Sequence, residues 1–187
     1  MEEMTAILAH LPIEILTLDS YPEIGDIPET GDTLKDNAFI KAQAVHDFTG
    51  LPALADDTGL EVDALDGAPG VFSARYAGEN ATFADNCNKM IEALDGKPSK
   101  ERTARFRTVI AFVKQEEKLW TEGLVEGLIL DQRKGSGGFG YDSIFYYQEL
   151  NKTFAELKKS EKNNISHRGK ALRNFCKILE KRIKTNG

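Results

Sequence analysis

The sequence predicts a single α/β domain in which helices flank a mixed β-sheet. Its 187 residues correspond to about one domain of ordinary size. Apolar residues recur at helical spacing within 33–50 and 165–183, and the segments 103–113 and 118–130 have the composition of two long strands. Because helices separate some of the expected strands while others are adjacent, a mixed sheet is expected rather than a purely parallel one.

The first third of the chain is expected to contain two helices and one strand. The pattern predicts a helix over 2–10 and a strand over 13–18. Thr33 can open the second helix, because Asp36 stands three residues later in a near capping box. Gly50 suits the end of this helix as a C-cap. Its core-facing residues are expected to be Leu34, Ala38, Ala42, Val45 and Phe48.

The rest of the chain continues the alternation of helices and strands. Short strands are expected over 53–56 and 60–65, on either side of a turn at Asp57, Thr58 and Gly59, and a helix over 84–94. Thr153 and Glu156 repeat the capping pattern at a short helix. The last amphipathic helix is marked by Ile165, Leu172, Phe175, Leu179 and Ile183.

Composition excludes several classes of protein. A net charge of −6 argues against a dedicated nucleic-acid binder, and no apolar run approaches the ~20 residues of a membrane span. No signal peptide pattern opens the chain. Cys87 and Cys176 lack metal-site or redox spacing, so we expect two reduced thiols in a cytoplasmic protein.

Adjacent carboxylates form the first candidate site, in LADDTGLEVDAL over 54–65. Neighbouring residues of a strand point to opposite faces, so Asp56 and Asp57 cannot chelate one ion in the same way. One of them could face a cleft, hold Mg²⁺ and accept a proton from water, while the other braces the loop. The alternative is an Asx-turn, in which an Asp side chain caps its own backbone.

A glycine-rich loop forms the second, in GSGGFGYD over 135–142. Glycines allow a close approach of the backbone to a ligand, and Phe139 or Tyr141 could stack on a base. The loop lacks the Lys-Ser/Thr of a P-loop. The alternative is a hairpin turn whose aromatic side chains pack on the core.

Basic side chains form the third candidate, in KNNISHRGKAL over 162–172. His167 and Arg168 stand at an expected helix start, which favours anionic or carbonyl oxygens, and Lys162 adds a cation. In ETGDTLKDNAFIKA over 29–42, Glu29 lies in a loop and Lys41 lies near the core edge of a helix. The alternatives are ordinary surface residues and a lysine whose stem packs while its amine reaches water.

Together these segments resemble the inosine triphosphate pyrophosphatase family, which removes non-standard purine nucleotides. The matching stretches are ETGDTLKDNAFIKA, LPALADDTGLEVDALDGAPGVFSARYAG, GSGGFGYD and EKNNISHRGKAL, in the family's order and spacing. The resemblance implies an elongated α/β fold with two lobes around a nucleotide cleft, a homodimer, and hydrolysis of ITP, dITP and XTP to the monophosphate and pyrophosphate.

The resemblance also implies roles for individual residues. Asp57 matches the catalytic carboxylate and, with Glu29, the Mg²⁺ ligands. The residues that match substrate-binding positions are Lys41, Thr58, Phe139, Gly140, Tyr141, Asp142, Lys162, His167 and Arg168. Among them, the family reads the purine 6-oxo group with His167 and Arg168.

The sequence departs from the family at two places. Ser143 replaces a proline, and Met1 aligns after the family's first strand and T-x-N-x-x-K phosphate loop. The domain at 1–187 is therefore expected to lack that strand and loop. This leaves a catalytically impaired nucleotide-binding protein as the alternative function. A plain metal-binding structural domain is a third reading, which explains the paired aspartates but not the basic helix start.

Overall fold

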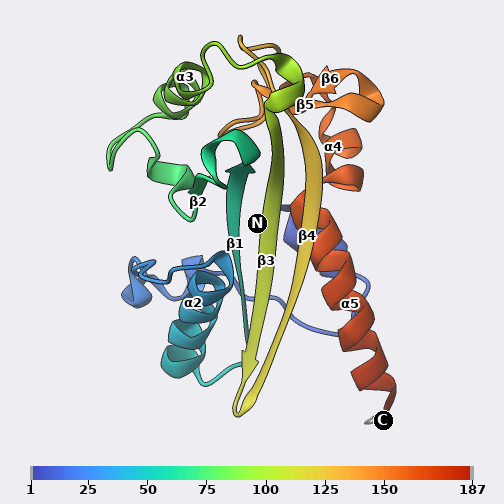
Figure 1. Ribbon diagram of the computed structural model, residues 1–187. Coiled ribbons are helices and arrows are strands. Elements are labelled where there is room, and N and C mark those ends of the chain that lie inside the picture. The colour runs from blue at the N-terminus through green and yellow to red at the C-terminus, as the bar shows by residue number, and fades with distance from the viewer. Residues whose placement is uncertain (1, 186–187) are drawn as a thin grey trace. The chain divides into compact units, whose positions relative to one another are not determined.

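The computed structural model describes the backbone of residues 2–185 and the side chains of residues 4–182. One sheet has the strand order β2-β1-β3-β4-β5-β6 (Figure 1). Its strands are β1 (Ala53–Val62), β2 (Pro69–Gly70), β3 (Thr103–Lys114), β4 (Glu117–Ile129), β5 (Phe145–Tyr147) and β6 (Lys152–Thr153). The α-helices of the described residues are α1 (Glu2–Leu8), α2 (Leu34–Thr49), α3 (Phe83–Ala93), α4 (Lys159–Ile165) and α5 (His167–Thr185).

The sheet is antiparallel in the pairings whose register is defined. Leu60 of β1 lies opposite Gly70 of β2, β4 pairs with β5, and β5 pairs with β6. Strands β3 and β4 form a hairpin joined by two residues, one of which, Gln115, has a φ of 53°. The α/β class and the helices flanking a sheet are confirmed. The pairings of defined register are all antiparallel, whereas a mixed sheet also contains parallel pairs.

Contacts within the chain define two compact units. Unit 1 comprises Met1–Asp57, Thr108–Gly123 and His167–Gly187, and unit 2 comprises Thr58–Arg107 and Leu124–Ser166. Strands β1, β3 and β4 each contribute residues to both units. That the whole chain behaves as one domain stays a prediction. In the described part of the chain, every helix is too short or too polar to span a lipid bilayer.

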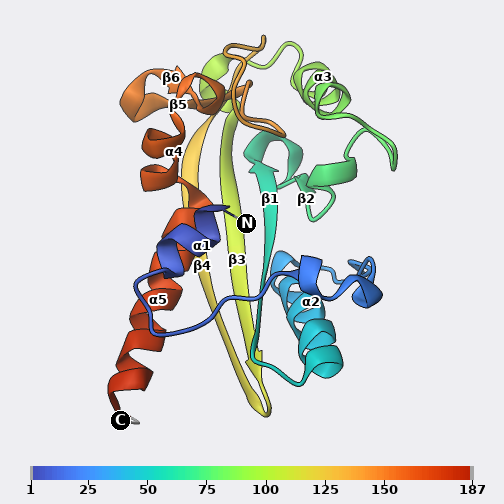
Figure 2. The same cartoon turned by 180° about the vertical axis from the view of Figure 1, so that it is seen from behind.

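Unit 1 has a helix on each face of its strands. Helix α1 packs on α5 (Figure 2), and both bury apolar residues against Ile110 and Leu54 of the strands. Helix α2 begins at the predicted cap, where the Thr33 hydroxyl accepts the N–H of Asp36. It ends at Gly50, whose φ of 69° is left-handed, as a glycine C-cap permits.

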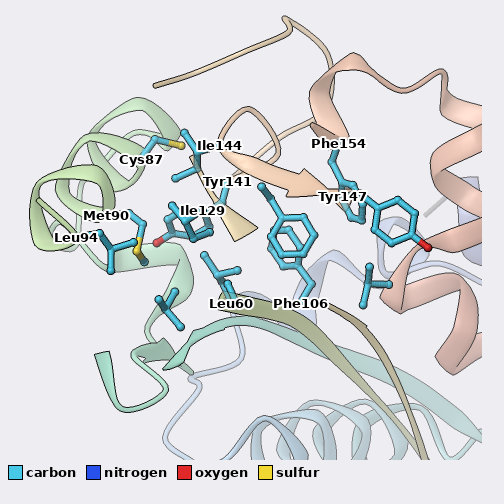
Figure 3. Packing of buried hydrophobic residues seen from close by; sticks show 14 residues of the cluster. Leu60, Cys87, Met90, Leu94, Phe106, Ile129, Tyr141, Ile144, Tyr147 and Phe154 are labelled. Carbon is cyan, nitrogen blue, oxygen red and sulfur yellow. The ribbon is translucent and has the colours of Figure 1, made fainter. Parts of the chain in front are cut away.

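Unit 2 has an aromatic core. Its members come from β1, α3, β3, β4 and the segment after the glycine-rich loop (Figure 3). The ring of Phe145 lies 4.6 Å from that of Phe106 and 4.8 Å from that of Phe154, centroid to centroid. Phe145 and Phe154 are fully buried, and edge or tilted packing of such rings adds to their apolar burial. This core anchors the segment that carries the glycine-rich loop.

Three sequence-based predictions are wrong. Residues 13–18 form no strand, since none of the described strands pairs with them, and Ile13 and Leu16 are exposed. The expected turn around Asp57 is absent, because β1 runs straight through it and Gly59 needs no positive φ. Phe48 is 53% exposed, because the last turn of α2 extends past the buried stripe.

Other elements agree with the sequence or were missed by it. Helices close to 2–10 and 84–94, the two long strands, and a helical turn capped by Thr153 and Glu156 are confirmed. Ile165 belongs to α4, which the sequence did not predict, rather than to the last helix. The short strands β2, β5 and β6 were also missed, because two or three residues carry no periodicity.

Gly123 of β4 allows the first turn of α5 to lie directly on the strand. A Cβ at this position would lie 2.0 Å from the carbonyl oxygen of His167 and 2.5 Å from the nitrogen of Ala171. Because both are backbone atoms, no side-chain rotation relieves the clash. We expect Gly123→Ala to lower the free energy of unfolding by about 1–3 kcal/mol or more, measured by urea denaturation.

Lys118→Ala provides the control, because Lys118 is exposed on the same strand and should change stability by no more than about 0.5 kcal/mol. Equal stability of the Gly123→Ala variant and the unsubstituted protein would contradict the close approach of strand and helix.

Candidate active site

In unit 1, two carboxylates converge on one ammonium group. The Nζ atom of Lys41 lies 2.7 Å from Oε1 of Glu29 and 2.7 Å from Oδ1 of Asp57. Glu29 comes from the loop before α2, Lys41 from α2 and Asp57 from β1. Asp57 is 7% exposed, so its charge needs a partner. The structure therefore brings together three of the residues that the sequence singled out.

Asn37 ties this cluster to the loop before α2, and the sequence analysis gave it no role. It lies one helical turn before Lys41 and is fully buried. Its side chain accepts the N–H of Gly31 at 2.7 Å and donates to Oδ2 of Asp57 at 3.4 Å. A Cβ on Gly31 would lie 2.6 Å from the Cβ of Asp36, so the loop can approach α2 only with glycine there. No local pattern in the sequence marks Asn37, because one of its partners, Asp57, is distant in the chain.

The cluster shifts the pKa values of its members. Burial alone lowers the pKa of Lys41, but its hydrogen bonds and charge interactions with Asp57 and Glu29 outweigh burial and raise the pKa. Burial raises the pKa of Asp57, and the charge of Glu29 adds to this, against the opposing hydrogen bonds from Lys41 and Asn37. A carboxylate of raised pKa is a better proton acceptor than an ordinary aspartate.

The other aspartate of the pair faces the opposite side of β1. Oδ2 of Asp56 accepts a hydrogen bond from Nε of Arg168 at 3.0 Å and forms an ion pair with Nη2 at 2.9 Å. Arg168 is the second residue of α5, and His167, the first, is buried. The predicted alternation of Asp56 and Asp57 is confirmed, and the partner of Asp56 is a residue of α5. That one of the two carboxylates braces a loop stays a prediction.

The converging carboxylates of Glu29 and Asp57 could hold a divalent cation. Both oxygens already point at one position, which the ammonium group of Lys41 shares. Among the described residues, no group of three or more His, Cys, Asp and Glu side chains gathers in a metal-binding arrangement. The protein would thus supply two ligands, which suits Mg²⁺, an ion that keeps several waters and binds substrate phosphates.

In unit 2, the glycine-rich loop is organised by Asp142. Oδ2 of Asp142 accepts the N–H of Phe139 at 2.8 Å and also pairs with Nζ of Lys162, from α4. Asp142 is buried. Gly138 has a φ of 74°, and a Cβ there would lie 2.0 Å from Oδ2 of Asp142. The loop therefore needs glycine at 138, and the carboxylate of Asp142 serves the loop and Lys162.

Phe139 is the exposed aromatic residue of this loop. Its side chain is 53% exposed, and Nζ of Lys162 lies 4.6 Å from its ring centroid. On the loop's flank, a pocket of about 300 Å³ is lined by Phe83, Ala84, Cys87, Arg133, 135–140, Asp142 and Ser143. A flat ring and a cation at a pocket edge can bind a planar base.

Tyr141 does not have the position expected of a stacking residue. It is 3% exposed and belongs to the core of unit 2 (Figure 3), and its hydroxyl donates to the carbonyl oxygen of Ser73 at 2.9 Å. The alternative reading of this loop, an aromatic packed on the core, holds for Tyr141 but not for Phe139. Gly140 separates the two and has a left-handed φ of 59°.

The predicted residues are divided between the two units. Unit 1 holds Glu29, Lys41, Asp57, His167 and Arg168, and unit 2 holds Thr58, Phe139, Gly140, Tyr141, Asp142 and Lys162. Thr58 follows Asp57 directly on β1 and is partly buried. The roles of these residues remain predictions.

Comparison with known proteins places the chain in a family. The model of the Ham1 family matches residues 1–178, and the chain belongs to the Ham1 family. It is 48% identical over 182 residues to a dITP/XTP pyrophosphatase of Desulforamulus reducens, which covers 97% of this chain and 90% of the relative. It is 49% identical over 173 residues to the dITP/XTP pyrophosphatase of Geobacter sulfurreducens, covering 92% of this chain and 87% of the relative.

Solved structures agree with this. A HAM1 protein from Coxiella burnetii has a TM-score of 0.91 and 45% identity, covering 96% of this chain and 92% of that protein. The Ham1 protein of Staphylococcus aureus has a TM-score of 0.89 and 37% identity, covering 97% of this chain and 93% of that protein. The predicted α/β class and the family resemblance are confirmed.

The burial of Tyr141 gives a test that separates a structural from a substrate-binding hydroxyl. Tyr141→Phe leaves the buried carbonyl oxygen of Ser73 without its donor, so we expect a loss of about 1–3 kcal/mol in the free energy of unfolding. The ring remains, so nucleotide affinity should not change.

Tyr146→Phe is the matched control, because its hydroxyl bonds to Asn151 in an exposed setting and should matter little to stability. Calorimetry measures both variants. A Tyr141→Phe protein of unchanged stability but weakened nucleotide binding would contradict the structural role.

Proposed function

We propose that the chain hydrolyses dITP, ITP and XTP to the monophosphate and pyrophosphate, with Mg²⁺ as cofactor. The observation that carries this proposal is the convergence of Glu29 and Asp57 on a single cation position in unit 1. The names of the relatives support the substrate class.

The chemistry follows from the two carboxylates. Mg²⁺, when held by Glu29 and Asp57, would neutralise charge on the phosphate oxygens. Asp57 accepts a proton from the attacking water, since its buried carboxylate lies at the predicted metal position. Asn37 fixes the orientation of the Asp57 carboxylate through Oδ2, which leaves Oδ1 for the cation side. The bond between the α- and β-phosphates is broken, and pyrophosphate leaves.

Base selection requires hydrogen-bond donors for a 6-oxo group. Arg168 and His167 supply donors at the start of α5, and Asp56 fixes the guanidinium through Nε and Nη2. Adenine presents an amino donor at this position, which would leave buried donors unpaired, and this is strongly disfavoured. In unit 2, the exposed ring of Phe139 provides a separate surface on which an aromatic base can stack.

Two further parts of the proposal concern the setting of the enzyme. We infer that it acts in the cytoplasm as a homodimer. Support comes from the reduced, unpaired cysteines Cys87 and Cys176 and from the family resemblance. Light scattering of the purified protein tests the dimer.

Pyrophosphate release tests the reaction itself. The chain should release pyrophosphate from ITP, dITP and XTP in the presence of Mg²⁺ and much more slowly from ATP. Tight binding of ITP without release of pyrophosphate would contradict the proposal and assign the chain a binding role.

Asp57→Asn removes the proton acceptor while it preserves shape. We expect kcat/KM for ITP to fall by more than tenfold, a loss above ~1.4 kcal/mol in transition-state stabilisation. Asp47→Asn, an exposed substitution in α2, serves as the control and should retain full activity. If Asp57→Asn keeps more than about a tenth of the original kcat/KM, Asp57 is neither base nor metal ligand.

Arg168→Ala should reduce the preference for ITP over ATP more than it reduces ATP turnover, because the donor to the 6-oxo group is lost. Asp56→Asn should give a weaker effect in the same direction, since it loosens the guanidinium without removing it. The measurement is the ratio of kcat/KM for the two substrates. An equal fall for both would instead assign Arg168 to the phosphates.

A further inference from the structure

Lys41 occupies the position toward which both predicted metal ligands point. Its ammonium group lies 2.7 Å from Oε1 of Glu29 and 2.7 Å from Oδ1 of Asp57. A cation bound by these two oxygens would lie within the same space, because each ligand distance to Mg²⁺ is only about 2.0–2.1 Å. A divalent ion and this ammonium group therefore compete for the same two oxygens.

We propose that Lys41 is an internal counter-cation that a divalent metal displaces. This inference rests on the metal assignment of the proposed function. Lys41 neutralises the two carboxylates of the metal-free protein, and metal binding releases its ammonium group. The released charge has the sign that phosphate oxygens attract, so metal binding and triphosphate binding are coupled through one side chain.

The burial of Glu29 and Asp57 explains why the metal-free protein needs a counter-cation. The Asp57 side chain is 9% exposed and that of Glu29 is 31% exposed. Two carboxylates that share a partly buried space repel each other and disfavour ionisation. A lysine on α2 removes this cost without fixing the site, since its flexible stem can swing away, and its own side chain is 20% exposed.

The geometry of α2 permits the displacement. Asn37 holds Oδ2 of Asp57 and the N–H of Gly31 independently of Lys41. The carboxylate of Asp57 therefore keeps a partner when Lys41 leaves.

Metal binding to the protein alone tests the inference without any turnover. Mn²⁺ serves as the probe, because the paramagnetic resonance signal of free Mn²⁺ disappears on binding. Lys41→Met keeps the apolar stem and removes the competing charge. We expect its affinity for Mn²⁺ to exceed that of the unsubstituted protein by on the order of tenfold, within the usual range of site coupling. The Lys41→Gln variant should bind Mn²⁺ as tightly as Lys41→Met. Lys41→Arg, which keeps the charge, should bind Mn²⁺ as weakly as the unsubstituted protein.

Lys35→Met is the matched control. It removes one charge from the same helix, where the Lys35 ammonium lies 4.3 Å from the ring of Trp120. It should leave Mn²⁺ affinity within about twofold, because a solvent-screened charge away from the site acts weakly.

Thermal unfolding provides the second readout. Without its counter-charge, the metal-free Lys41→Met protein should unfold at a lower temperature than the original, and Mg²⁺ should raise its midpoint by more than it raises that of the original. If this variant folds only with Mg²⁺ present, that result supports the inference as well.

Two outcomes would overturn the inference, and they differ. If Glu29→Gln removes Mn²⁺ binding but Lys41→Met and Lys41→Gln do not strengthen it, the metal assignment stands and Lys41 is not a counter-cation that the metal displaces. If Glu29→Gln leaves Mn²⁺ binding unchanged, or the unsubstituted protein binds no Mn²⁺, the metal assignment itself fails, and the inference fails with it.

Discussion

The alternation of side chains along β1 is the constraint on which the unit 1 site depends. Asp56 and Asp57 are adjacent, so a strand must send them to opposite faces. One meets Arg168 of α5 and the other meets Lys41 of α2. A turn at this position, as the sequence suggested, would have allowed both carboxylates to face the same way. Because β1 continues through this position, Asp56 contacts α5 and Asp57 contacts α2.

The two helices reach these positions for reasons that are local. The start of helix α2 is fixed by the Thr33 cap and by the close approach of Gly31. These two contacts determine where Asn37 and Lys41 lie along the strand. Helix α5 rests on β4 because Gly123 has no side chain. Glycines at points of backbone contact therefore determine the positions of charged groups that lie several residues away.

Local features of the structure could be predicted from the sequence, and features that depend on distant partners could not. A capping signal and helical spacing predicted α2, and helical spacing predicted α5, since both are local properties. The prediction of a strand over 13–18 was wrong, because a strand forms only beside a pairing partner, and the composition of a segment does not show whether it has one. Asn37 was missed for a related reason, since a buried amide is recognisable only when its partners, Gly31 and Asp57, are known. Most candidate residues were singled out by their motifs, the family resemblance supplied their roles, and their individual contacts required the structure.

In each unit, one lysine of the predicted binding residues is paired with an acidic side chain. Lys41 pairs with Glu29 and Asp57 in unit 1, and Lys162 pairs with Asp142 in unit 2. If Lys41 binds phosphate as proposed, it exchanges one anion for another, so the net gain is small unless a metal takes over the carboxylates that Lys41 releases. Under the proposed function, the anionic ligand and the divalent cation therefore favour each other, because Lys41 already neutralises Glu29 and Asp57.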